Sequence, residues 1–178
     1  MSSRNEQRID NLCMLENLVP KVVYDQIKIF LEHYRSGFGA SRLFRFDLDE
    51  EGIIRQKMQM RREYLRMIRL PMEEFKEEQD RLFQNLRGFP WMREVIEIVL
   101  NEIAVNVEDG NLYKRIIVGY YLKSDGCSNE EMARAENMST ASFERKKREA
   151  IKCFGISLYR YAYRREMEDR EDNSYVGI

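Results

Sequence analysis

A dense group of basic side chains lies near the end of the sequence. Residues 145–165 hold eight lysines and arginines against one acid, within a chain whose formal net charge is -1. Lysine and arginine neutralise phosphates, and arginine also recognises guanine edges. The segment therefore predicts recognition of a polyanion such as duplex DNA. On charge alone, a solvated helix face is an equally open interpretation.

The residues before this group predict two capped helices that would position it. Ser128 stands three residues before Glu131, which is the spacing of a capping box at the start of a short helix over 130–136. Asn137 suits a left-handed helix end, and Ser139 suits the cap of a second, longer helix. We expect the following residues to face inward: Met132, Ala133, Phe143, Ala150, Ile151 and Phe154.

A short helix, a tight turn and a longer basic helix together predict a helix-turn-helix. An ordinary helical hairpin is the alternative. The candidate DNA-binding residues are Thr140, Ala141, Ser142, Glu144, Arg145, Lys146, Lys147, Arg148 and Lys152. We expect Arg145 and Arg148 to contact guanine and Glu144 to contact cytosine. The three lysines are expected to hold phosphates, with Ser128 or Ser142 as a further contact.

The segment SNEEMARAENMSTASFERKKREAIKCFG resembles the helix-turn-helix of sigma-factor region 4, and in particular the ArpU/RinA type of phage-associated transcriptional regulators. The likeness covers about residues 111–155. It departs at Asn129 and Glu136, where the family often has apolar residues. The resemblance implies a sequence-specific transcriptional regulator that controls late or lysis genes.

The rest of the chain has the apolar spacing of helices, so the predicted fold is all-α: a helical N-terminal region followed by the C-terminal helix-turn-helix. Helices are expected over 20–34, 50–70, 72–86, 91–105 and 111–122, with a loop or a short extended piece over 36–49. The predicted organisation is a helical partner or oligomerisation region over 1–108, a DNA-binding domain over 109–170 and a flexible tail over 171–178. The tyrosine-rich segment after Gly155 either extends the second helix or folds back to form a dimer surface, and glycine, which disfavours helix interiors, would permit a bend at this position.

A second basic stretch runs from Arg55 to Arg69 and holds six bases and one acid. It either follows DNA phosphates beside the main site or pairs with acids inside the fold. Residues 72–110 hold ten acids and four bases, so enough opposite charge is available within the chain. We favour pairing for this reason.

Several classes of protein lose support from what the sequence lacks. His33 is the only histidine, and the sequence contains no phosphate-binding loop, dinucleotide-binding or metalloprotease motif. We expect neither a cofactor nor a metal site, and no enzyme activity. Three widely spaced cysteines fit reduced thiols. Neither a membrane span nor a signal peptide is evident, so we expect a cytoplasmic protein.

Two other functional classes stay open beside the transcription regulator. One is a DNA-packaging adaptor similar to phage small terminase subunits, which also join a helix-turn-helix to oligomerising helices. The other is an interaction module whose basic face binds an acidic protein. The expected partners are double-stranded DNA, then RNA polymerase through the acidic helices of 72–108, and a second copy of the chain as a homodimer.

Overall fold

The computed structural model describes residues 3–37, 49–87, 92–123 and 125–176, and within these ranges the protein is helical with no strand. The elements are α1 (Arg4–Leu15), α2 (Pro20–Gly37), α3 (Glu50–Met67), α4 (Met72–Arg87), α5 (Met92–Asn106), α6 (Gly110–Ile117), the π-helical segment η2 (Val118–Leu122), α7 (Asn129–Ala135) and α8 (Thr140–Val176). The predicted all-α class is confirmed for this part of the chain. The loop or extended piece expected over 36–49 falls mostly on residues 38–48, outside the described residues.

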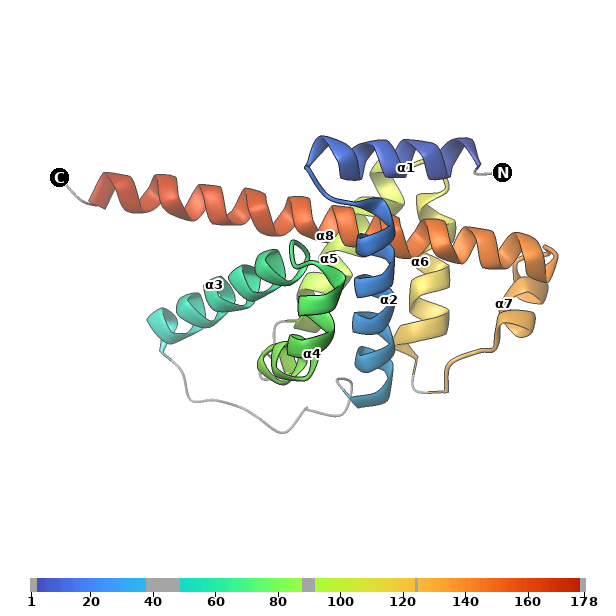
Figure 1. Ribbon diagram of the computed structural model, residues 1–178, viewed down its shortest axis with the longest axis horizontal. Helices are drawn as coiled ribbons and strands as arrows, with labels where there is room; N and C mark the ends of the chain where they lie inside the picture. The colour runs from blue at the N-terminus through green and yellow to red at the C-terminus, as the bar shows by residue number, and fades with distance from the viewer. Residues whose placement is uncertain (1–2, 38–48, 88–91, 124, 177–178) are drawn as a thin grey trace.

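The long helix α8 is the axis around which the other helices pack (Figure 1). It has 37 residues and is therefore about 55 Å long. It packs against α1, α2, α3, α5, α6 and α7. The short helix α7 lies beside the N-terminal end of α8 at one end of the molecule, while the C-terminal end of α8 extends past α3 at the other (Figure 1).

Helix ends follow local signals in the sequence. Asn17 has a φ of 57° and ends the turn after α1, and Pro20 begins α2. Asp49 accepts a hydrogen bond from the backbone N–H of Gly52 and caps α3. These polar caps satisfy amides that have no partner within the helix. The start predicted for α2, at Pro20, is confirmed.

The two halves of the chain contribute to one buried core. Phe154 of α8 lies in the same buried cluster as Ile27 of α2 and Ile103 of α5. The boundary predicted at residue 109 falls between α5 and α6, and these two helices pack against each other. The predicted N-terminal and C-terminal regions thus share their packing rather than forming separate cores.

Two sequence predictions concern the course of α8 beyond its first turns. The helix continues through Gly155, which is the first of the two alternatives for this segment, and α2 crosses so closely here that a side chain at position 155 would have no space. It also continues through residue 176, so most of the tail predicted to be flexible is helical. Residues 177–178 lie outside the described residues.

None of the described helices combines the length and the apolar character that a bilayer-spanning segment requires.

Candidate nucleic-acid interface

The first helix of the candidate site, α7, begins with the predicted capping box. The hydroxyl of Ser128 accepts a hydrogen bond from the backbone N–H of Glu131 at 3.2 Å. In return the Glu131 carboxylate accepts from the backbone N–H of Ser128 at 2.7 Å, which lowers the pKa of Glu131. Met132 and Ala133 are buried, as the sequence predicted. The start and the inward face of this helix are therefore confirmed.

A turn of four residues connects α7 to α8. Asn137 takes a left-handed conformation with a φ of 54°, and the backbone N–H of Met138 donates to the carbonyl of Ala133 at 3.0 Å. Ser139 then caps α8, because its hydroxyl accepts from the backbone N–H of Ser142 at 3.1 Å. Phe143 is fully buried one turn further along. Both ends of the turn thus have the geometry expected from the sequence.

Four of the nine candidate DNA-binding residues are exposed on the first turns of α8. Thr140, Ala141, Arg145 and Arg148 are all exposed, and the spacing from 141 to 145 to 148 places these three on one side of the helix. Neither arginine forms a hydrogen bond or ion pair with another described residue. Ser142 is half-buried, and its hydroxyl accepts from that of Ser139 at 3.0 Å.

Glu144 and Lys147 lie against α7 instead of solvent. The side-chain amide N–H of Asn129 donates to the Glu144 carboxylate. The side-chain oxygen of Asn129 accepts from Lys147 Nζ at 2.8 Å. Lys147 Nζ also lies 4.0 Å from the centroid of the Tyr120 ring, and the residue is only 6% exposed. The expected contacts of Glu144 with cytosine and of Lys147 with phosphate do not fit these positions, because both side chains hold the start of α7 on α8.

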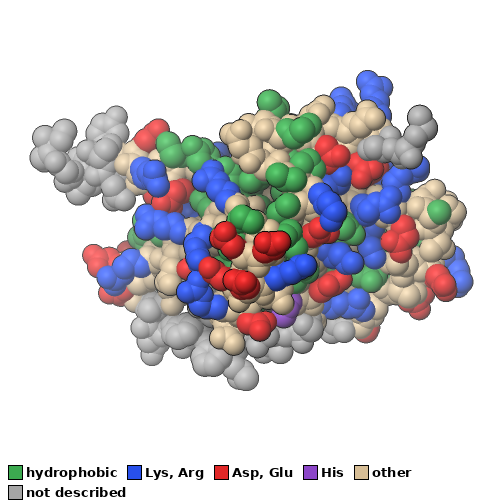
Figure 2. All heavy atoms as spheres, in the orientation of Figure 1, with side chains coloured by type: hydrophobic (Ala, Val, Ile, Leu, Met, Phe, Trp, Pro, Cys, Tyr) green, Lys and Arg blue, Asp and Glu red, His purple; other side chains and the backbone are tan. Residues whose placement is uncertain are grey.

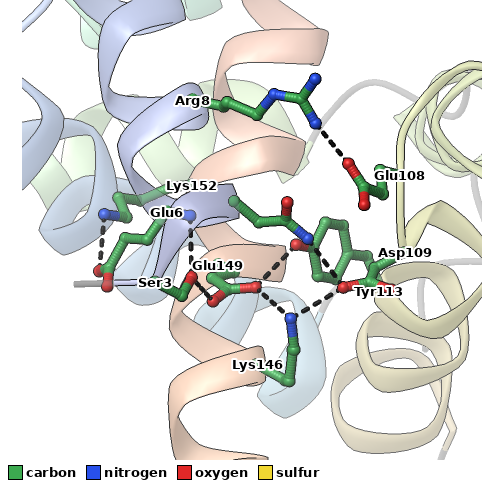
Figure 3. A network of polar contacts seen from close by, with 10 residues as sticks. Ser3, Glu6, Arg8, Glu108, Asp109, Tyr113, Lys146, Glu149 and Lys152 are labelled. Carbon is green, nitrogen blue, oxygen red and sulfur yellow. Dashed lines mark hydrogen bonds and ion pairs between the residues drawn. The ribbon is translucent and has the colours of Figure 1, made fainter. Parts of the chain in front are cut away.

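Lys146 belongs to a polar network between α1, α6 and α8 (Figure 3). Its Nζ lies 2.8 Å from Asp109 Oδ2 and 2.9 Å from Glu149 Oε2. Burial disfavours its charged form, but the hydrogen bonds to these carboxylates outweigh that effect and raise the pKa of Lys146. Glu149 is completely buried and also accepts from the hydroxyls of Ser3 and Tyr113. Lys146 is thus neutralised within the fold.

Lys152 is neutralised by the N-terminal helix. Its Nζ lies 2.9 Å from Glu6 Oε1 and 2.6 Å from Asp10 Oδ1, and the residue is 6% exposed. Burial again opposes the charge, but hydrogen bonds to Asp10 and Glu6 raise the pKa of Lys152. The expected phosphate contacts of Lys146, Lys147 and Lys152 are therefore corrected: the fold supplies internal partners for all three lysines.

Sequence reasoning missed two contributors to this site. Glu136, noted only as a departure from the sigma-like pattern, forms a bidentate ion pair with Arg115 of α6, at 2.8 and 2.9 Å. The hydrogen bond from Arg115 lowers the pKa of Glu136. The exposed side chain of Arg134 on α7 adds a basic group beside the turn. The acid at position 136, where the sigma-like pattern often has an apolar residue, was the signal that an ion pair holds the end of α7 against α6.

The second basic stretch pairs mainly with the C-terminal part of α8. Arg61 binds Asp169, and Arg62 Nε lies 2.8 Å from Glu166 Oε1. Arg66 pairs with Glu78 of α4 at 2.5 Å. Pairing inside the fold, which the sequence analysis favoured, is confirmed for these three arginines.

Comparison of the chain with family models, with curated proteins and with solved structures gives no match in any of the three. Within the described ranges, no three or more histidine, cysteine, aspartate or glutamate side chains are grouped so that they could hold a metal ion.

Proposed function

We propose that the chain is a sequence-specific transcription regulator that binds duplex DNA through a helix-turn-helix formed by α7, the turn and the first turns of α8. The observation that carries this proposal is that Arg145 and Arg148 are both exposed on the first turns of α8. This part of α8 lies beside α7 at one end of the molecule (Figure 1). Both guanidinium groups are uncommitted within the described chain. We call Thr140, Ala141, Arg145 and Arg148 the reading face.

The reading face has side chains suited to the major groove. A guanidinium donates two parallel hydrogen bonds to O6 and N7 of guanine, and each such pair contributes about 1–3 kcal/mol of discrimination against a wrong base. Ala141 offers a methyl group for contact with thymine, and the hydroxyl of Thr140 can donate or accept. Arg145 and Arg148 are therefore the expected base-reading residues.

The electrostatic contribution to binding is expected to be small. Lys146, Lys147 and Lys152 have internal partners, and the first turn of α7 carries the exposed acids Glu130 and Glu131. Figure 2 shows lysine and arginine interspersed with aspartate and glutamate over the visible face rather than gathered in one basic surface. Because each neutralised phosphate steepens the salt dependence by roughly 0.9 log unit, few phosphate contacts predict a shallow dependence.

Selection of bound duplexes from a random library tests the proposal. The wild-type chain is expected to enrich one sequence motif that contains guanines. The double variant Arg145→Ala/Arg148→Ala is expected to lose this enrichment. Arg165→Ala/Arg170→Ala removes the same charge from exposed positions of α8 far from the reading face, and it is expected to retain the motif. Absence of enrichment by the wild-type chain, even at low salt, would favour a protein-interaction module instead.

A further inference from the structure

A hollow of about 540 Å³ lies among α1, α5, α6 and α8. Its volume is within the range of sites that hold small molecules, roughly 300–1,000 Å³. It is separate from the reading face, since none of the four residues of that face lines it. Its lining combines an apolar floor with a charged rim.

The floor of the hollow is apolar. Ile9, Ile103 and Ile156 are almost fully buried and come from α1, α5 and α8, respectively. Leu12 and Val107 are half-buried and add two further apolar side chains to the lining. A hydrocarbon or aromatic group that entered here would leave water for a surface of methyl groups. The floor therefore fits the apolar body of a ligand.

The rim carries three guanidinium groups against two carboxylates. Arg8 pairs with Glu108 across the space between α1 and the start of α6 (Figure 3), and Arg164 lies 3.0 Å from Glu102. The third rim arginine, Arg160, pairs with a glutamate that does not line the hollow. The rim therefore has more positive than negative charge.

The rim arginines keep donors available for a ligand. The side chains of Arg8, Arg160 and Arg164 are 58%, 45% and 55% exposed, and each contacts its carboxylate through one nitrogen. A guanidinium has five N–H donors in a planar fork that matches a carboxylate. An oxyanion at the opening could thus bind these arginines while its apolar body covers the floor.

We propose that this hollow binds a small amphipathic anion, an apolar chain or ring that carries one carboxylate or a similar oxyanion. The site joins the N-terminal helix to α8, so its ligand stabilises the docking of α1. The proposal is independent of DNA binding, because it depends on different residues.

Three probes with the same alkyl chain test the choice of ligand: octanoate, octanol and octylammonium. Each is titrated into the full chain with labelled isoleucine methyl groups and followed by NMR. Octanoate is expected to bind most tightly and to shift the methyl signals of Ile9, Ile103 and Ile156. Equal binding of the three probes would overturn the proposal. So would shifts confined to Ile68, which lines a separate groove beside Pro71.

Variants of the rim test the role of the arginines. Arg160→Ala/Arg164→Ala is expected to weaken octanoate binding about tenfold or more and to leave octanol binding unchanged, because hydrogen bonds to a charged group are lost. Arg165→Ala/Arg170→Ala removes the same charge outside the hollow and is expected to bind octanoate as the wild type does. Equal weakening in the two double variants would contradict a site at this rim. Thermal unfolding of each variant, compared with the wild type, checks that the fold is retained.

Discussion

Lys147 and Arg148 are adjacent in the chain, yet α8 turns one side chain inward and the other toward solvent. Lys147 is held by Asn129 and the ring of Tyr120, whereas Arg148 is exposed. A basic run in a sequence therefore combines two kinds of residue. Those that face the fold maintain the position of α7, and those that face solvent are available to a ligand.

This difference predicts unequal effects of two neighbouring substitutions on stability. Lys147→Ala is expected to lower the free energy of unfolding by about 1–3 kcal/mol, because the half-buried amide of Asn129 loses its charged partner and the packing of the buried Lys147 side chain is lost. Arg148→Ala is expected to change stability by less than about 0.5 kcal/mol, as is usual for exposed positions. Urea denaturation of both variants measures these values. Equal stability of the two variants would mean that Lys147 does not seat α7.

The pair of Arg115 and Glu136 predicts a dependence on pH. The hydrogen bond from Arg115 lowers the pKa of Glu136 below its ordinary value of 4.5. A lowered pKa in the folded state stabilises the fold above pH 4.5, and this contribution is lost as the pH falls through the folded pKa. Arg115→Ala is therefore expected to be less stable than wild type near neutral pH, by less than about 1 kcal/mol for this partly exposed pair.

An NMR titration of the Glu136 carboxyl checks this assignment. In Arg115→Ala its pKa is expected to rise toward 4.5, and the difference in stability from the wild type is expected to disappear in acid. The same Glu136 pKa in both proteins would show that Arg115 does not hold this carboxylate in solution.

At the scale of elements, Gly155 shows how a residue that disfavours helix can be required within one. A Cβ atom built at Gly155 would lie 2.6 Å from Ile27 Cγ1 and 2.8 Å from Val23 Cγ1. Both atoms belong to branched side chains of α2 that are fully buried. The glycine therefore permits the close crossing of α2 over a continuous α8.

We expect Gly155→Ala to destabilise the protein by about 1–3 kcal/mol, because overpacking at the crossing exceeds the gain of about 1 kcal/mol in helix propensity. In the background of Ile27→Ala, the same substitution is expected to cost less, since the nearer of its two obstacles is removed. Urea denaturation of the single and double variants gives this coupling. A Gly155→Ala protein more stable than the wild type would rule out the close crossing.

At the scale of the whole molecule, ion pairs join the first helix, α1, to the last helix, α8. Lys152 of α8 is buried between Glu6 and Asp10 of α1. Removing the carboxylates leaves the ammonium of Lys152, whose side chain is 8% exposed, as an uncompensated buried charge. Removing the ammonium instead leaves two carboxylates that are 15% and 30% exposed and can be hydrated. The docking of α1 therefore depends on these two acids.

This arrangement predicts an asymmetry between substitutions. Glu6→Gln/Asp10→Asn is expected to lower the free energy of unfolding by about 3 kcal/mol or more, and Lys152→Met is expected to lower it by less. Chemical denaturation at neutral pH provides the comparison. A larger loss in Lys152→Met than in the double variant would contradict a buried, paired ammonium.

Local features of the fold could be predicted from the sequence. The capping box of Ser128 and Glu131, the left-handed Asn137 and the start of α2 at Pro20 each depend on residues within one turn. The inward positions of α7 and α8 follow from helical spacing, which is equally local. These signals were sufficient to predict the order of the helices, the start of α7 and the turn between α7 and α8.

The partners of the basic residues could not be predicted, because they come from distant parts of the chain. Glu6 is 146 residues from Lys152, and Asp109 is 37 residues from Lys146. Helical spacing shows that these lysines lie near the boundary of the buried face but not which helix covers them. The same limit applies to Gly155, where the close approach of α2 determines the role of the residue.

We propose that the reading face, rather than the general charge of α8, recognises DNA. Fluorescence anisotropy of the duplex enriched by selection tests it directly with two charge-matched double variants. Arg145→Ala/Arg148→Ala is expected to lose about a hundredfold or more in affinity, whereas Arg165→Ala/Arg170→Ala is expected to bind nearly as the wild type does. Equal losses in the two variants, or full affinity in the first, would contradict the account.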